Sequence, residues 1–346
     1  GAHVVFPTPA GYRGDGVFDN FWKLCERWGT TFIITVPTAV SALMQRPVDA
    51  DVSKVKNAFS GSAPMPLELF NRFTKSTGIQ IIEGYGLTEA TVLVSINPVD
   101  GEKRVGSVGL PFPYNDVKII AHKGDGPVEC APDEIGEICV AGPGVYAGNT
   151  YTEADKNVDL YYHDKYLRTG DLGRIDPEGY IWITGRAKDL IIRGGHNIDP
   201  AEIEDALLTH QDVAFAGAIG QPDAHSGELP CAYVELVAGA TATADDLMAH
   251  AKKHIHERAA IPKHVEVLVE LPKTAVGKVF KPDLRKSAIT RVYNAALEEA
   301  GVSARVTSVV DDKKRGLVAQ LTANSATEEE VSQVLGSFVR PWEWTS

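Results

Sequence analysis

The sequence predicts a mixed fold, α/β in its first part and α+β toward its end. Three observations lead to this class. Up to residue 98, short apolar runs alternate with helix-spaced patterns; from 99 to 185, short alternating runs are cut by glycine and proline; from 186 onward, helix caps stand between strand-like runs. We therefore expect a parallel covered sheet, a small antiparallel barrel-like region and an α+β domain, in that order.

The first part reads as strands interleaved with helices. Helix-spaced apolar residues occur over 16–29 and 66–78. Because strands that alternate with helices form parallel sheets, residues 1–98 are predicted to be an α/β subdomain. The predicted buried strands are 4–6, 32–36, 55–59 and 79–82.

The pattern of apolar and polar residues changes after Asn97-Pro98. Alternating runs at 116–121, 136–141 and 180–184 indicate antiparallel strands, so residues 99–185 are predicted to form a β-rich, barrel-like subdomain.

A third unit is predicted over residues 186–285. Asp199-Pro200 is typical of a helix start, and the helix is expected to reach about His210. We expect strands at 213–219, 232–237 and 265–269 and a further helix at 244–258. Residues 286–346 form an appended α/β tail, to which we assign no role, with an apolar-faced helix, a hairpin at 311–316 and a helix that begins after Thr327.

Composition excludes several classes of protein. The chain has 346 residues, of which 44% are hydrophobic and 23% charged, as in ordinary globular proteins. Its 34 basic and 46 acidic residues give a net charge of −12, which argues against nucleic-acid binding. The four cysteines form no Cys-x-x-Cys pair, and no apolar run is long enough to span a membrane, so we expect a cytoplasmic protein. The chain opens without methionine in a strand-like run, so we expect an upstream part to be missing.

The first informative stretch is Glu83-Gly84-Tyr85-Gly86-Leu87-Thr88-Glu89, directly after a predicted strand. Ligands bind at the carboxyl ends of strands in open α/β sheets. The glycines permit a close approach of the backbone, Tyr85 has a flat face for a base, Thr88 a hydroxyl for a phosphate oxygen, and Glu89 a hard oxygen for Mg²⁺. A turn with a packed tyrosine is the alternative interpretation.

Two further stretches carry candidate polar groups. One runs from Tyr166-Leu167-Arg168-Thr169-Gly170-Asp171 to Ile198, and the other is the loop 272–278, which ends in Lys278. Asp171 could accept two ribose hydroxyls, and Arg186 could donate to the same sugar or to phosphate. Alternatively Asp171 caps a turn, Arg186 pairs with Asp189 on the surface, and Lys278 is a solvated loop lysine.

Together, the three stretches resemble the adenylate-forming superfamily of acyl-CoA synthetases, luciferases and peptide-synthetase adenylation domains, from residue 1 to about 285. The overall run is most similar to bacterial fatty-acyl-CoA synthetases. The resemblance implies an AMP-forming acid–thiol ligase that makes acyl-CoA from a fatty acid, ATP and CoA through an acyl-adenylate, with Mg²⁺. It also implies that the C-terminal domain is a mobile lid and that the partners are small molecules.

The resemblance also implies roles for individual residues. Gly61, Ser62, Ala63 and Pro64 would cover one face of adenine and Tyr85 the other, with Glu83 and Gly84 at its edge. Thr88 would contact the α-phosphate, Glu89 the magnesium, and Asp171 and Arg186 the ribose. Asn197 would belong to the AMP site, Lys188 would be the hinge, Gly194 and Gly195 would line the pantetheine tunnel, and Lys278 would be the adenylation lysine.

Two departures from the family and two rival functions remain. The Ser/Thr/Gly-rich loop that holds the β- and γ-phosphates does not occur in these residues, so we expect the chain to bind AMP weakly and not to activate acids with ATP by itself. The tail after about 285 has no counterpart in the family pattern. The rivals are an adenylation domain that loads a carrier protein and a non-catalytic AMP-binding module.

Overall fold

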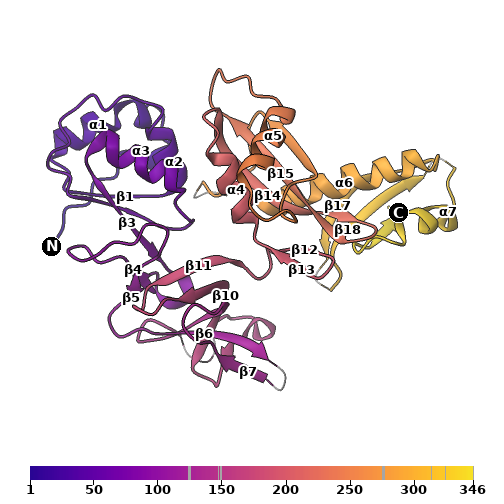
Figure 1. Ribbon diagram of the computed structural model, residues 1–346, viewed down its shortest axis with the longest axis horizontal. Helices are drawn as coiled ribbons and strands as arrows, with labels where there is room; N and C mark the ends of the chain where they lie inside the picture. Colours follow the sequence, from indigo (N-terminus) through magenta and orange to yellow (C-terminus); the bar gives the residue numbers. More distant parts are fainter. Residues whose placement is uncertain are drawn as a thin grey trace. The chain divides into compact units, whose positions relative to one another are not determined.

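The structure of the protein is a computed structural model that describes residues 1–123, 126–146, 148, 150–274, 277–312, 314–323 and 325–345. The chain divides into two compact units, Gly1–Ala187 and Lys188–Ser346, and Figure 1 traces both from the N-terminus to the C-terminus. The mixed α/β class predicted from the sequence is confirmed. The division into four parts at residues 98, 185 and 285 stays a prediction.

The first unit begins with a mainly parallel sheet in the order β1-β2-β3-β4-β5, in which β1, β2 and β3 run parallel. Trp22, Leu43 and Phe73, one from each of the three helices, are buried against Ala58 and Ile81 of the strands. In Figure 1 the three helices lie together beside these strands. The elements are η1 (Gly11–Arg13), α1 (Val17–Trp28), β1 (Phe32–Thr35), α2 (Pro37–Leu43), β2 (Asn57–Ser60), α3 (Leu67–Thr77), β3 (Gln80–Tyr85), η2 (Thr88–Ala90), β4 (Ser95–Ile96) and β5 (Leu110–Pro111).

One predicted strand is wrong. Residues 4–6 form no strand, and the side chains of Val4 and Phe6 are 63% and 79% exposed. A strand needs a neighbour for its backbone hydrogen bonds, and among the described residues β1 pairs only with β2. An apolar run that pairs with no other segment therefore stays irregular.

The second sheet of this unit is antiparallel, in the order β11-β10-β8-β6-β7, with β9 paired to β10. The barrel-like expectation needs correction, because the described strands β11 and β7 are opposite edges of an open sheet. Closing a barrel requires the edge strands to pair with each other. The strands are β6 (Asp116–Lys123), β7 (Gly126–Glu129), β8 (Gly136–Ala141), β9 (Tyr161–Tyr162), β10 (Tyr166–Ile175) and β11 (Ile181–Arg186), with η3 (Ala154–Asn157) before β9.

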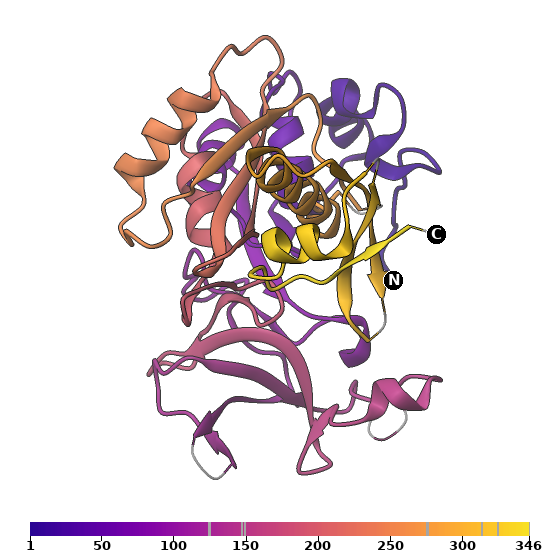
Figure 2. The same cartoon turned by 90° about the vertical axis from the view of Figure 1, so that its right-hand side faces the viewer.

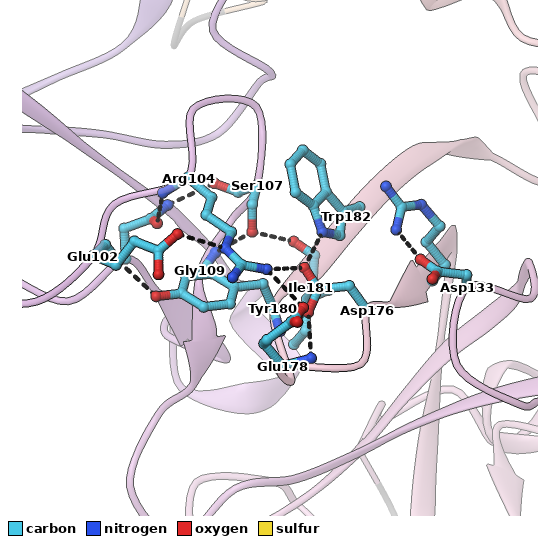
Figure 3. Close-up of polar contacts among 12 residues, drawn as sticks. Glu102, Arg104, Ser107, Gly109, Asp133, Asp176, Glu178, Tyr180, Ile181 and Trp182 are labelled. Atoms are coloured by element: carbon cyan, nitrogen blue, oxygen red, sulfur yellow. Dashed lines mark hydrogen bonds and ion pairs between the residues drawn. The ribbon is translucent and has the colours of Figure 1, made fainter.

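A polar cluster around Arg104 connects the segment after β4 to the β10–β11 turn (Figure 3). The guanidinium lies 4.3 Å from the ring centroid of Tyr180 and donates to Asp176 Oδ2 at 2.7 Å. Trp182 Nε1 donates to the same oxygen at 2.9 Å. Burial, the largest single influence, raises the pKa of Asp176, but the hydrogen bonds from Trp182, Tyr180 and Arg104 outweigh it and hold that pKa below its ordinary value.

The second unit contains a sheet in the order β13-β12-β15-β14, with β16 parallel to β15. Alternate residues of β15 face opposite sides: Ala232 and Val234 pack in the cluster of α4 and α5, whereas Cys231 and Tyr233 pack against α6. Figure 2 shows these helices on opposite sides of the sheet. The elements are β12 (Ile191–Arg193), β13 (His196–Ile198), α4 (Pro200–Leu208), β14 (Val213–Asp223), β15 (Gly227–Leu236), α5 (Ala244–His254), β16 (His264–Leu268) and α6 (Lys281–Glu299).

The tail is a three-stranded sheet, β17-β18-β19, that shares α6 with the rest of the unit. Leu284 and Ala288 of α6 pack on β15, and Tyr293 and Leu297 pack in the tail's core, so one helix belongs to both cores. The predicted hairpin and the helix after Thr327 are confirmed. The elements are β17 (Ala304–Asp312), β18 (Gly316–Ala323), α7 (Glu328–Leu335) and β19 (Trp342–Trp344). In the described part of the chain, no helix has the length and apolarity needed to cross a membrane.

We expect Asp176→Asn to lower the free energy of unfolding of the first unit by about 2 kcal/mol at pH 7, because it removes a charged acceptor from several donors. Since the pKa of Asp176 is lowered by folding, its contribution is present above about pH 4 and is lost as the pH falls through the folded-state value. Urea unfolding followed by tryptophan fluorescence at pH 7 and pH 3 measures the difference, which should shrink at pH 3.

Asp133→Asn is the matched control, because Asp133 pairs with Arg174 beside the same turn but is 52% exposed (Figure 3). Its effect should stay within about 0.5 kcal/mol at both pH values. Equal losses in the two variants would contradict the account of the Arg104 cluster.

Candidate functional site

The predicted adenine-binding segments lie at the same edge of the parallel sheet. Residues 61–64 follow β2 directly, and the stretch 86–89 follows β3. Ser60, the last residue of β2, is the register partner of Glu83, two residues before the end of β3. The loop and the motif therefore emerge side by side at the carboxyl ends of parallel strands, where open α/β sheets bind ligands.

The turn that follows β3, residues 86–92, is tightly packed and strained, and we call it the motif turn. A Cβ at Gly86 would lie 1.3 Å from the carbonyl oxygen of Val92, so only glycine fits at this position. Thr91 and Val92 have φ values of 54° and 80°, in the left-handed region that β-branched residues avoid. Ser62, in the neighbouring loop, has a φ of 71°. Backbone strain of this kind is held in place by surrounding contacts and concentrates at functional sites.

Asp171 is the centre of the site. Tyr85 Oη donates to Asp171 Oδ2 at 2.6 Å, and Arg186 Nε donates to Oδ1 at 2.7 Å. Asp171 and Arg186 are register partners on β10 and β11, and Tyr85 ends β3 of the other sheet. Side chains from two of the quoted stretches therefore meet at the Asp171 carboxylate, and their roles toward a ligand stay predictions.

The carboxylate retains capacity for a ligand. An ionised carboxylate has about four acceptor sites, of which Tyr85 and Arg186 occupy two. Burial, followed by the charge of Asp171, raises the pKa of Tyr85, so its hydroxyl stays protonated and donates. The Arg186 side chain is 62% exposed, and the interpretation of Arg186 as a surface partner of Asp189 is wrong, since Asp189 pairs with Arg285.

Glu83 has a structural role in addition to any contact with a ligand. Its carboxylate is buried, and Oε2 accepts from the backbone N–H of Gly106 at 3.0 Å. Burial raises its pKa, against the effect of hydrogen bonds from Gly106 and Met65. Contacts of Glu83 and Gly84 with the edge of adenine stay a prediction.

Glu89 is half-buried and accepts a hydrogen bond at Oε1 from the hydroxyl of Tyr151. That bond, followed by burial, raises the pKa of Tyr151 to about 12. No group of three or more His, Cys, Asp or Glu side chains within the described ranges could hold a metal alone. Mg²⁺ bound with a nucleotide takes one or two carboxylates together with phosphates and water, so a single glutamate fits this ion. Thr88, beside it, is exposed.

Gly194 and Gly195 form the two-residue turn between β12 and β13 in the second unit. Their φ values of 58° and 83° are those of the turn that tightens a β-hairpin. Asn197 lies on β13 opposite Ile192 and is exposed. The hairpin presents backbone without side chains at its tip.

Lys278 lies on a short loop of the second unit. Thr274 and Lys278 exchange hydrogen bonds: the Thr274 N–H donates to the Lys278 carbonyl at 2.7 Å, and the Lys278 N–H donates to Thr274 Oγ1 at 3.1 Å. The lysine side chain is exposed. Ala275 and Val276 of the predicted loop lie outside the described residues.

The structure brings together the predicted residues of the first unit, and it adds two that the sequence analysis missed. Thr169 Oγ1 accepts from the backbone N–H of Asp171 at 3.1 Å and lies inside the quoted motif, so a signal for it existed. Tyr151, which donates a hydrogen bond to Glu89, lies outside the quoted motifs, so the sequence carried no signal for it. The predicted residues of the second unit lie apart in the sequence: Lys188 is exposed at the start of the unit, Gly194, Gly195 and Asn197 belong to the β12–β13 hairpin, and Lys278 follows β16.

Comparison with protein families gives two matches. The AMP-binding enzyme family matches residues 1–149, and the AMP-binding enzyme C-terminal domain matches residues 202–278. The two matches occur in order along the chain, one in each compact unit.

Curated relatives are CoA ligases. The chain is 38% identical to the marinolic acid–CoA ligase of Pseudoalteromonas sp. (strain SANK 73390) over 338 residues, 96% of this chain and 51% of that protein. It is 38% identical to the long-chain-fatty-acid–CoA ligase of Bacillus subtilis (strain 168) over 261 residues, 75% of this chain and 46% of that protein. The chain thus spans about half the length of these relatives, and the first match includes most of residues 286–346.

Solved structures of related enzymes are similar in fold. ATP-bound MatB from Rhodopseudomonas palustris matches with a TM-score of 0.70 and 32% identity over 78% of this chain and 52% of that chain. The anthranilate CoA ligase AuaEII in complex with anthranoyl-AMP matches with a TM-score of 0.73 and 26% identity over 84% of this chain and 55% of that chain.

Proposed function

Because this chain belongs to the adenylate-forming superfamily of AMP-binding enzymes, we propose that it carries the AMP subsite and the C-terminal domain of an AMP-forming acyl-CoA synthetase. The reaction is the ligation of a fatty carboxylic acid to CoA at the expense of ATP, through an acyl-adenylate. The observation that carries the proposal is the Tyr85–Asp171–Arg186 cluster, which joins the carboxyl end of β3 to β10 and β11.

In the proposed AMP subsite, Asp171 accepts hydrogen bonds from the two ribose hydroxyls with the acceptor sites that Tyr85 and Arg186 leave. The exposed guanidinium of Arg186 donates to the same sugar. Adenine lies between Tyr85 and the backbone of residues 61–64, which come from neighbouring strand ends. Thr88 donates its hydroxyl to the α-phosphate.

Glu89 is the proposed protein ligand of Mg²⁺, which would offset the negative charge of the nucleotide phosphates. In this proposal the carboxylate of Glu89 determines where the ion lies relative to the motif turn. Lys278 adds a cation for the first half-reaction, in which an anionic acid attacks the α-phosphorus of ATP.

The two halves of the reaction place different demands on the second unit. Thioester formation requires an open path for the pantetheine thiol, which the glycine turn at Gly194 and Gly195 provides in this proposal. Rotation about Lys188 would exchange Lys278 for this turn. The boundary between the two compact units falls between Ala187 and Lys188, which supports this position for the hinge.

We expect Asp171→Asn to weaken AMP binding about 10- to 100-fold, because hydrogen bonds to a charged acceptor are among the stronger ones. Asp116→Asn is the matched control, since Asp116 also accepts from a tyrosine hydroxyl, that of Tyr166, at 2.6 Å and contacts Lys165. Calorimetry with AMP on residues 1–346 measures both variants. Equal weakening by the two variants, or unchanged binding in Asp171→Asn, would contradict the AMP subsite.

We expect the protein to convert supplied fatty acyl-AMP and CoA into acyl-CoA and AMP, a half-reaction that needs no contacts with pyrophosphate. Lys278→Ala should leave this rate within about 3-fold, because its charge acts before the acyl-adenylate exists, whereas Gly195→Val should lower it at least about 10-fold by filling the turn. Chromatography of the thioester measures the rate for a series of acyl chain lengths.

The outcomes separate the proposed function from its rivals. Transfer to a pantetheinylated carrier protein but not to CoA would favour the carrier-loading function. Binding of AMP without any transfer would favour a non-catalytic module. Equal loss of the rate of acyl-CoA formation in Lys278→Ala and Gly195→Val would contradict the assignment of the two half-reactions to two separate loops.

A further inference from the structure

We propose that Tyr151 is a positioning residue for Glu89, whose carboxylate it holds through a hydrogen bond so that the remaining carboxylate oxygen is set for Mg²⁺. This inference rests on the proposed function, in which Glu89 is the protein ligand of the metal. It concerns a residue outside the three sequence stretches that carry the site.

The contact itself is specific. Tyr151 Oη donates to Glu89 Oε1 across 62 positions in the sequence, and both side chains are half-buried. Hydrogen bonds to ionised acceptors are stronger than those between neutral groups. A carboxylate fixed at one oxygen loses most of its rotamer freedom and presents the other oxygen in a defined direction.

The backbone of Tyr151 is itself anchored. Its N–H donates to Asn157 Oδ1 at 2.9 Å, and its carbonyl accepts from Asn157 Nδ2 at 2.7 Å. Asn157 is the last residue of η3. This paired contact fixes the point from which the tyrosine side chain reaches Glu89, as a positioning role requires.

A second contact ties the same connection between β8 and β9 to the motif turn. Thr91 Oγ1 donates to the carbonyl of Gly144 at 2.6 Å. A Cβ at Gly144 would lie 3.0 Å from the carbonyl oxygen of Ala90, so the two segments approach closely. The turn that carries Glu89 is strained at Thr91 and Val92 and is supported from outside at two points.

Metal binding depends on such supporting groups. Residues that hydrogen-bond to a metal ligand orient it, and their loss typically costs 10- to 100-fold in metal affinity. We expect the dependence to be large where the protein supplies a single carboxylate, because no second protein ligand holds the ion beside the phosphates and water.

The test is the metal dependence of ATP binding to residues 1–346, measured by calorimetry with and without Mn²⁺ as the probe. In Tyr151→Phe we expect the gain in ATP affinity on adding Mn²⁺ to fall about 10-fold, with metal-free ATP affinity unchanged. Tyr161→Phe is the matched control, because the hydroxyl of Tyr161 bonds to Thr150 and to the carbonyl of Tyr146 in the same segment. It should keep the full Mn²⁺ effect.

A double-mutant cycle with Glu89→Gln sharpens the test. If Tyr151 acts through Glu89, Tyr151→Phe has no further effect on the metal dependence once Glu89 is replaced. An unchanged Mn²⁺ effect in Tyr151→Phe would overturn the inference, and so would equal losses in Tyr151→Phe and Tyr161→Phe, which indicate a general effect on the segment.

Tighter Mn²⁺ binding in Tyr151→Phe would also overturn it, because the tyrosine would then compete with the metal. Wild-type protein that binds ATP without any Mn²⁺ effect would overturn the assignment of Glu89 itself, and this inference with it. That result differs from a wild-type Mn²⁺ effect that survives in Tyr151→Phe, so failure of the proposed metal site and failure of the Tyr151 role are distinguishable.

Discussion

The hydrogen bonds at the carboxylate of Asp171 are the interactions on which the candidate site depends. Tyr85 comes from the parallel sheet, and Asp171 and Arg186 come from the antiparallel sheet, so the two sheets of the first unit meet at this group. A buried carboxylate is costly unless donors satisfy it, and here a tyrosine hydroxyl and a guanidinium do so. The same arrangement that holds the sheets together leaves two acceptor sites for a ligand.

Two further connections support this junction. Glu83, two residues before Tyr85, accepts from the backbone of Gly106, and the segment that follows β4 is fastened by Arg104 to Asp176 at the β10–β11 turn. The end of β3 and the β10–β11 turn are therefore also linked through residues 104–106, in addition to the contacts at Asp171. In the second unit, α6 belongs to two cores, so the tail is part of one compact body with the domain that carries Lys278.

Much of the fold could be predicted because its signals are local. Apolar periodicity located β1, β2, β3, α1 and α3, and Thr327 located the start of α7. The errors concern partners that periodicity does not reveal: residues 4–6 have strand-like composition but no neighbouring strand, and an alternating pattern does not tell an open sheet from a barrel. The Tyr85–Asp171–Arg186 group was predictable because each member lies in a motif, whereas Tyr151 reaches Glu89 through a long-range contact that leaves no mark in the sequence.

The most direct test of the account is a crystal structure of residues 1–346 with AMP. The account predicts the ribose hydroxyls within about 3 Å of the Asp171 carboxylate oxygens, with adenine between Tyr85 and the backbone of residues 61–64. The Tyr85 and Arg186 contacts to Asp171 should persist beside the sugar. AMP bound elsewhere, or an Asp171 carboxylate that contacts only Tyr85 and Arg186 while AMP is bound, would contradict it.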